Sequence, residues 1–114
     1  MAAQLQKQTP EMVEYNQKMK ELQGLYLSRQ KLISQKNENE MVKKELSLVE
    51  DDDVVYKLNE GNLEEEDPLE AEMCVDQRLD YLNSELKKCD TKEVELKAQV
   101  DDLKKKLATQ RPSN

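Results

Sequence analysis

A seven-residue apolar repeat runs through the second half of this chain. Steps of four and three residues alternate along it and reach Val75, Leu79, Leu82, Leu86, Cys89, Glu93, Leu96, Val100, Leu103 and Leu107. Of these positions only Glu93 is not apolar, and most residues between them are charged. Such a repeat is typical of a helix that buries one stripe of side chains against another helix. Because a single stripe cannot bury itself, the rest of the chain must supply its cover.

The first half of the chain carries a second stripe with the same spacing. Thr9-Pro10-Glu11 has the residues of a helix start, with an N-cap, a proline at the first helical position and an acid in the first turn. The stripe that follows consists of Met12, Tyr15, Met19, Leu22 and Tyr26, and of the ladder Leu25, Leu32, Asn39 and Leu46. Asn39 either sets the register of the helix pair or occupies a loosely packed, water-filled turn.

A short β-hairpin is predicted between the two helices. Val54–Leu58 is β-branched and aromatic, as strands are, and Asn59–Asn62 has turn chemistry. Leu63–Glu66 is a weaker candidate for the second strand, because three of its four residues are glutamates. Asp67-Pro68-Leu69-Glu70 then restarts a helix with an acidic cap and a proline at the first position. Arg111-Pro112 is expected to end that helix.

The sequence therefore predicts a mainly α fold, with two long helices in an antiparallel coiled coil joined by a short β-hairpin. We expect one domain over residues 1–114, with helices at about 10–48 and 68–109, a linker at about 49–67 and short, frayed tails. An isolated two-stranded hairpin is unstable and exposes its edges. A partner sheet would cover it, so we expect an obligate or near-obligate oligomer.

The composition excludes several functions. A net charge of −7 argues against nucleic acid and anionic membrane surfaces, which require a basic face. Histidine is absent, and there is no phosphate-binding glycine loop or zinc cluster, so we expect no enzyme activity, catalytic residue, metal or cofactor. The acidic runs Glu50–Asp53 and Glu64–Asp67 lack the alternating ligand spacing of a calcium loop and are interpreted as solvated surfaces.

The polar N-terminal residues, the absence of a long apolar run and the two cysteines lead us to expect a cytosolic location. The N-terminal residues are polar, so no signal peptide is predicted, and no apolar run reaches transmembrane length. Cys74 and Cys89 would lie about 22 Å apart on one helix, too far for a bridge within the chain. They are interpreted as reduced thiols, although an intermolecular bond remains open.

The order of helix, strand pair and helix resembles the β-type subunits of the prefoldin family. The resemblance covers roughly residues 12 to 90. It is carried by the blocks Ser28–Leu32, Glu38-Asn39, Met41–Leu46, Val54–Leu58 and Arg78–Leu82, and by the spacing between them. The chain departs from the family at the second strand, where relatives carry an apolar run and this sequence has Asn62–Asp67. Either this edge strand faces solvent, or a basic neighbour meets it.

The resemblance implies a subunit of a hexameric, ATP-independent chaperone. In that family the hairpins form a double β-barrel platform, and the coiled coils extend from it and hold unfolded chains, such as actin and tubulin, for the cytosolic chaperonin. Carried onto this sequence, the subunit-assembly residues are Val54, Val55, Tyr56, Leu58, Leu63, Arg78, Asp80 and Tyr81. Tyr81 is expected to pack under the strands, and Arg78 and Asp80 to form intersubunit or intrahelical pairs.

Client contacts are expected at the start of the first helix and the end of the second. The candidate residues are Met12, Val13, Tyr15, Leu103 and Leu107. Exposed methionine and other apolar side chains suit a client of no fixed shape, because burial requires no particular donor geometry. The alternative for Leu103 and Leu107 is that they simply close the helix interface. The rival function is a structural coiled-coil scaffold or tether without chaperone activity, for which the strand Val54–Leu58 has no use.

Overall fold

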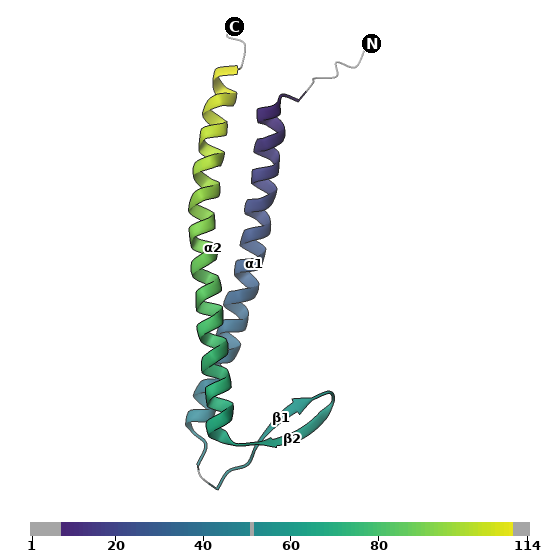
Figure 1. The fold of residues 1–114 in the computed structure, drawn as a ribbon, viewed down its shortest axis with the longest axis vertical. Coiled ribbons are helices and arrows are strands. Elements are labelled where there is room, and N and C mark those ends of the chain that lie inside the picture. The colour runs from purple at the N-terminus through teal and green to yellow at the C-terminus, as the bar shows by residue number, and fades with distance from the viewer. Residues whose placement is uncertain (1–7, 51, 111–114) are drawn as a thin grey trace. The chain divides into compact units, whose positions relative to one another are not determined.

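The computed structural model describes residues 8–50 and 52–110. Helix α1 spans Pro10–Ser47, strands β1 and β2 span Val55–Asn59 and Asn62–Glu66, and helix α2 spans Pro68–Gln110 (Figure 1). Two helices joined by a two-stranded antiparallel hairpin confirm the predicted fold class. The predicted lead-in before Gln8 and the stop at Arg111-Pro112 lie outside the described residues, as does Asp51.

Both helices begin where the sequence predicts, and the same kind of cap holds each start. The Thr9 hydroxyl accepts a hydrogen bond from the backbone N–H of Met12 at 3.2 Å. The carboxylate of Asp67 accepts one from the backbone N–H of Leu69 at 3.0 Å. In each case a side-chain oxygen satisfies a backbone donor that has no partner within the helix. The following proline has no N–H to satisfy.

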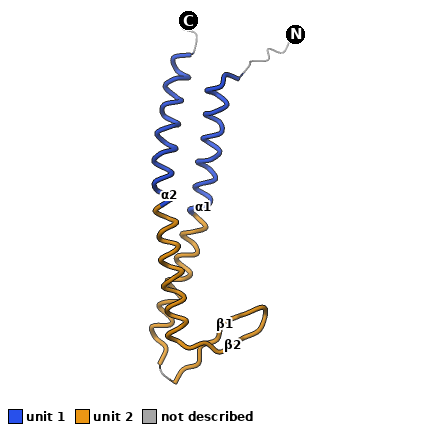
Figure 2. Tube along the Cα trace, viewed as in Figure 1, with its two compact units in different colours: residues 1–29, 88–114 blue, residues 30–87 orange. Residues whose placement is uncertain are grey.

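The described residues fall into two compact units, and each contains a segment of both helices (Figure 2). Unit 1 is drawn as residues 1–29 and 88–114 and contains the start of α1 and the end of α2. Unit 2 is residues 30–87 and contains the remaining helix segments and the hairpin.

The buried core is supplied almost entirely by α2. Seven of the ten positions predicted for its stripe are buried, namely Val75, Leu79, Leu82, Cys89, Leu96, Val100 and Leu103. The other three, Leu86, Glu93 and Leu107, are half-buried, so the whole stripe faces inward. Ala71, one turn before Val75, extends the buried stripe toward the start of the helix. Both cysteines are free thiols, with Cys89 buried and Cys74 exposed.

Helix α1 follows the predicted stripe in part, with Tyr15 and Met19 half-buried as expected. Leu22 is its one buried residue among those described. Met12 and Tyr26, predicted to lie on the stripe, are 37% and 39% exposed. The ladder Leu25, Leu32, Asn39 and Leu46 is half-buried, and so are the charged residues that alternate with it, Arg29 and Lys36. The inward face of α1 is therefore partly polar, which weakens its apolar pattern.

The hairpin closes with a two-residue turn. Glu60 and Gly61 have positive φ angles of 49° and 83°, the combination found in type I′ turns, whose twist matches that of the flanking strands. The strands pair in the register Val55↔Glu66, Tyr56↔Glu65, Lys57↔Glu64, Leu58↔Leu63 and Asn59↔Asn62. The predicted first strand was one residue early, because β1 begins at Val55 and runs through Asn59. Val54 lies outside it and is 56% exposed.

Candidate assembly and client-binding surfaces

The β-hairpin presents an apolar face that nothing in the described chain covers. Residues directly opposite in an antiparallel pair point to the same side. The register therefore places Tyr56, Leu58 and Leu63 on one side, and we call these three residues the apolar face of the hairpin. Their exposed fractions are 54%, 73% and 71%. Three large apolar side chains so exposed on one side of a two-stranded sheet mark an interaction surface.

The opposite side of the hairpin is polar. It carries the pairs Lys57↔Glu64 and Asn59↔Asn62, with Val55 and Glu66 nearest the helices in sequence. Lys57 and Glu64 have opposite charges directly across the ladder, which favours the pairing. The Asn59 amide also donates to the Glu64 carboxylate at 3.4 Å. Of the predicted assembly residues in this region, Tyr56, Leu58 and Leu63 thus share one face, while Val55 lies on the other.

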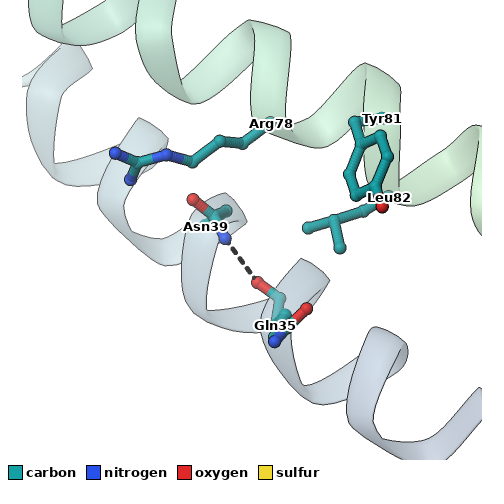
Figure 3. A pocket seen from close by; sticks show the side chains of 5 residues that line it. All are labelled: Gln35, Asn39, Arg78, Tyr81 and Leu82. Carbon is teal, nitrogen blue, oxygen red and sulfur yellow. Dashed lines mark hydrogen bonds between the residues drawn. The ribbon is translucent and has the colours of Figure 1, made fainter. Parts of the chain in front are cut away.

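Arg78 and Tyr81, predicted for assembly, line a hollow of about 320 Å³ in unit 2. Figure 3 shows Arg78, Tyr81 and Leu82 on α2 and Gln35 and Asn39 on α1. Tyr81 is 62% exposed, so within the described chain it is not covered by the strands, and its place in an assembly stays a prediction. The reason for this exposure is its helical position: it lies one residue before buried Leu82, which rotates it about 100° off the stripe.

Asn39 is a polar residue that lines the same hollow. Its side-chain amide donates to the carbonyl of Gln35 in its own helix at 2.7 Å (Figure 3). The two alternatives for Asn39 were a register-setting contact and a loosely packed turn. A bond to its own helix, beside an open hollow, favours the second, because a residue that sets register must bond across the interface.

An ion pair that the sequence analysis missed joins the helices within unit 2. The Lys43 ammonium lies 2.7 Å from the Asp76 carboxylate. The hydrogen bond from Lys43 to Asp76, together with the charge of Asp76, raises the pKa of Lys43 above 10.5. Smaller contributions come from the charges of Glu72 and Asp80. The expected pairing of Asp80 between subunits or within its own helix stays a prediction.

Glu93, the polar interruption of the α2 stripe, is held by a charge cluster in unit 1. One nitrogen of the Arg29 guanidinium lies 2.9 Å from the Glu93 carboxylate, and the other lies 3.1 Å from Asp90. Lys97, one turn further along α2, reaches the second oxygen of Glu93 at 2.9 Å. The Glu93 side chain is only 16% exposed. A half-buried carboxylate that needs a cation from the other helix favours one register of α1 against α2.

The same cluster lowers the pKa of Glu93. The hydrogen bond from Lys97 is the largest cause, and partial burial opposes its effect. The charges of Lys97 and Arg29 and a hydrogen bond from Tyr26 lower the pKa further. The pKa of Glu93 therefore lies below the ordinary value of 4.5. In return, Glu93 raises the pKa of Lys97. A carboxyl whose pKa is lower in the folded state stabilises that state above its unfolded pKa. The contribution is lost as the pH falls through the lowered value.

Replacing Glu93 by glutamine should therefore destabilise the helix pair in a pH-dependent way. Near neutral pH, Glu93→Gln leaves Arg29 without its half-buried partner, and urea should unfold the variant at a lower concentration than the wild type. The difference should shrink as the pH falls through the lowered pKa of Glu93, because the wild-type carboxyl then becomes protonated as well. Glu95→Gln is the control, because it removes the same charge at an exposed position of the same helix. Equal unfolding midpoints for the two variants at neutral pH would contradict the role of Glu93.

The client-binding candidates all lie in unit 1 but differ in exposure. Met12 and Val13 are 37% and 42% exposed, Tyr15 and Leu107 are half-buried, and Leu103 is buried. Leu103 therefore helps to close the helix interface, which was the alternative stated for it. Accessible apolar surface at this place belongs mainly to Met12 and Val13.

The start of α1 and the end of α2 meet in unit 1. The pKa of Glu11 is lowered, first by a backbone hydrogen bond and next by a side-chain hydrogen bond with Gln110, the last residue of α2. Val13 and Met19 also border a shallow hollow of about 560 Å³ along α1. Its other lining residues are polar: Gln8, Asn16, Gln17, Lys20 and Gln23. This surface offers small apolar patches among amides, and no enclosed pocket.

The described residues contain no group of three or more His, Cys, Asp or Glu side chains placed to hold a metal ion. None of the described helices combines the length and hydropathy needed to span a lipid bilayer.

A helical hairpin whose connection is a two-stranded antiparallel sheet is a recognised fold. The chain resembles the crystal structure of the prefoldin beta subunit from Thermococcus strain KS-1, with a TM-score of 0.81. The match covers 96% of this chain and 100% of that one at 19% sequence identity. At this identity the likeness is one of fold.

The family follows from the sequence comparisons. The family model for prefoldin subunits, Prefoldin_2, matches residues 4–112, and this chain belongs to that family. It is 37% identical over 109 residues to prefoldin subunit 6 of Mus musculus, covering 95% of this chain and 86% of the relative. Prefoldin subunit 6 of Homo sapiens is also 37% identical over 109 residues, and that match covers 95% of this chain and 84% of the relative. A probable prefoldin subunit 6 of Dictyostelium discoideum is 50% identical over 64 residues, which are 56% of this chain and 46% of that protein.

Proposed function

We propose that this chain is one subunit of a hexameric, ATP-independent chaperone of the cytoplasm. It assembles with other prefoldin subunits, holds unfolded polypeptides such as actin and tubulin, and delivers them to the cytosolic chaperonin. The observation that carries the proposal is the uncovered apolar face of the hairpin, Tyr56, Leu58 and Leu63. A chain of this family with such a face has a surface that sibling subunits can cover.

The assembly role is assigned to the hairpin and the neighbouring part of α2. Sheets join by main-chain hydrogen bonds along free edges, and apolar side chains add burial. Leu58 and Leu63 supply most of that exposed area, and Tyr56 adds its ring. Val54, Val55, Arg78, Asp80 and Tyr81 remain proposed contacts at the border of this surface. A tether or scaffold would have no use for such a face, which is why the chaperone assignment is favoured.

The client-binding role is assigned to unit 1. Met12 and Val13 supply exposed apolar atoms, and Tyr15 and Leu107 are half-buried. Scattered apolar patches bind through non-directional burial, which suits clients that share no structure. Methionine suits this role because its unbranched, polarisable side chain adapts to different neighbours.

Co-expression with five companion prefoldin subunits tests the proposal. The expected result is a stable, equimolar six-subunit particle that suppresses aggregation of a chemically denatured client in the absence of ATP. Substituting Met12 and Val13 by serine should weaken the suppression and leave the particle intact. A self-paired rod that leaves client aggregation unchanged would overturn the proposal in favour of the tether.

A further inference from the structure

The single charge on the apolar side of the hairpin restricts what can cover it. Glu65 is paired directly with Tyr56, so it lies on the same side as Tyr56, Leu58 and Leu63. Glu64 and Glu66 lie on the other side. The three consecutive glutamates of β2 are therefore not equivalent. One of them must enter any interface that buries the apolar face.

No cation of the hairpin neutralises Glu65. Lys57 is the only basic residue between Val55 and Glu66, and its ladder partner is Glu64 on the opposite side of the sheet. Within the described residues, Glu65 makes no ion pair or side-chain hydrogen bond. A chain that covers Tyr56, Leu58 and Leu63 also removes water from Glu65. A carboxylate that loses water without gaining a partner is costly, so the cover must bring its own cation.

The hairpin of a second copy of this chain cannot supply that cation. Pairing β2 with the β2 of a copy would align glutamates with glutamates, and like charges opposite one another destabilise a ladder. If β2 paired with the β1 of a copy so that the two apolar faces lay on the same side, the Lys57 of the copy would lie on the polar side, away from Glu65. Packing two apolar faces against each other would bring two Glu65 carboxylates together. Each arrangement leaves Glu65 unpaired or repelled.

We propose that the apolar face of the hairpin is covered by a different chain, which places a lysine or arginine side chain against Glu65, and that the acidic β2 strand prevents pairing with a second copy. The inference rests on the proposed function, since it concerns the neighbour in the same assembly. Two expectations were stated for the acidic strand, namely that it faces solvent or that a basic neighbour contacts it, and the proposal favours the second. Glu65 is then a residue that selects the neighbour, beside the leucines that supply burial.

A competition experiment with the full chain tests this proposal. Wild-type chain and Glu65→Lys chain, distinguishable by mass, are co-expressed with the five companion subunits, and native mass spectrometry measures which one enters the particle. Reversal at Glu65 should reduce incorporation at least about tenfold, because it opposes the neighbour's cation. Glu60→Lys, the same charge change in the turn of the hairpin, should remain within about twofold of wild type.

The outcomes separate this proposal from the proposed function. If wild-type chain enters no six-subunit particle, the proposed function fails. If it does, and Glu65→Lys enters as well as Glu60→Lys, the neighbour carries no cation at Glu65 and only the present inference is overturned. Helical circular dichroism of the isolated variants should match that of the wild type, which checks that each retains α1 and α2. A companion arginine or lysine whose change to glutamate restores Glu65→Lys would identify the partner residue.

A second measurement tests whether the chain pairs with a second copy of itself. In analytical ultracentrifugation, the isolated wild-type chain should not self-associate through its strands at low salt. A variant with Glu64, Glu65 and Glu66 all changed to glutamine should self-associate at least about tenfold more strongly, because the repulsion between β2 strands is gone. A wild-type homo-oligomer that Leu58→Ser disrupts would overturn the proposed selectivity.

Discussion

Replacing Leu58 and Leu63 together by serine is expected to remove this chain from the six-subunit particle. The two leucines face each other across the hairpin and are 73% and 71% exposed in the chain alone. Burying a leucine side chain contributes about 2 kcal/mol, so losing two should weaken assembly by about 3 kcal/mol or more. That loss corresponds to a reduction in affinity on the order of a hundredfold. Size-exclusion chromatography of the co-expressed subunits measures it.

A matched double substitution serves as the control. Lys57→Ser with Glu64→Ser changes the neighbouring ladder pair, which lies on the polar side of the same hairpin and carries no net charge. Its effect on assembly should be small, because exposed ion pairs contribute little. Equal losses from both double variants would mean that assembly depends on the hairpin's integrity and that its apolar face has no special role. Helix content should be unchanged in both.

Leu96→Ala is expected to lower the free energy of unfolding by about 3 kcal/mol. Leu96 is 3% exposed, the lowest fraction among the buried residues, and lies in unit 1 on the α2 stripe. Truncation removes buried methyl groups and leaves a cavity that a helix pair can only partly close. Urea unfolding of the full chain, followed by helical circular dichroism at fixed protein concentration, measures the change.

Val94 provides the comparison on the same helix. It is 70% exposed and lies two residues before Leu96, on the solvent side. Val94→Ala should change stability by less than about 0.5 kcal/mol, and alanine's higher helix propensity works in its favour. If both substitutions cost the same, the stripe that begins at Val75 is not the buried face of α2.

The α2 stripe was predictable because its period is carried by apolar residues alone. The α1 stripe was predicted only in part: Leu22 is buried and Tyr15, Met19, Leu25, Leu32, Asn39 and Leu46 are half-buried, but Met12 and Tyr26 are exposed. The inward positions of Arg29 and Lys36 were not foreseen, because their charge hides the period. A signal was nevertheless available for the charge cluster. Arg29 falls between Leu25 and Leu32 at the same spacing, and Glu93 interrupts the other stripe, so two half-buried charges of opposite sign required each other. Their pairing could not be derived, since neither periodicity fixes how one helix is aligned with the other.

The candidate assembly surface was predicted in residue type but not in arrangement. The strand Val54–Leu58 was recognised from its β-branched and aromatic residues, yet which side chains share a face depends on the register. That register follows from the two-residue turn at Glu60-Gly61, whose positive φ angles are a property of the folded chain. The exposure of Tyr81, in contrast, follows from the pattern itself, because Tyr81 lies one residue before Leu82 and therefore off the stripe.

The unequal contribution of the two helices to the core has a consequence for biosynthesis. Among the described residues, every buried side chain except Leu22 belongs to α2, which the ribosome makes after α1. The earlier half must remain unpaired until the later half emerges from the exit tunnel. During that delay the apolar side chains of the first helix, such as Leu22, remain in contact with water. Synthesis of the second helix is therefore the step that completes the core.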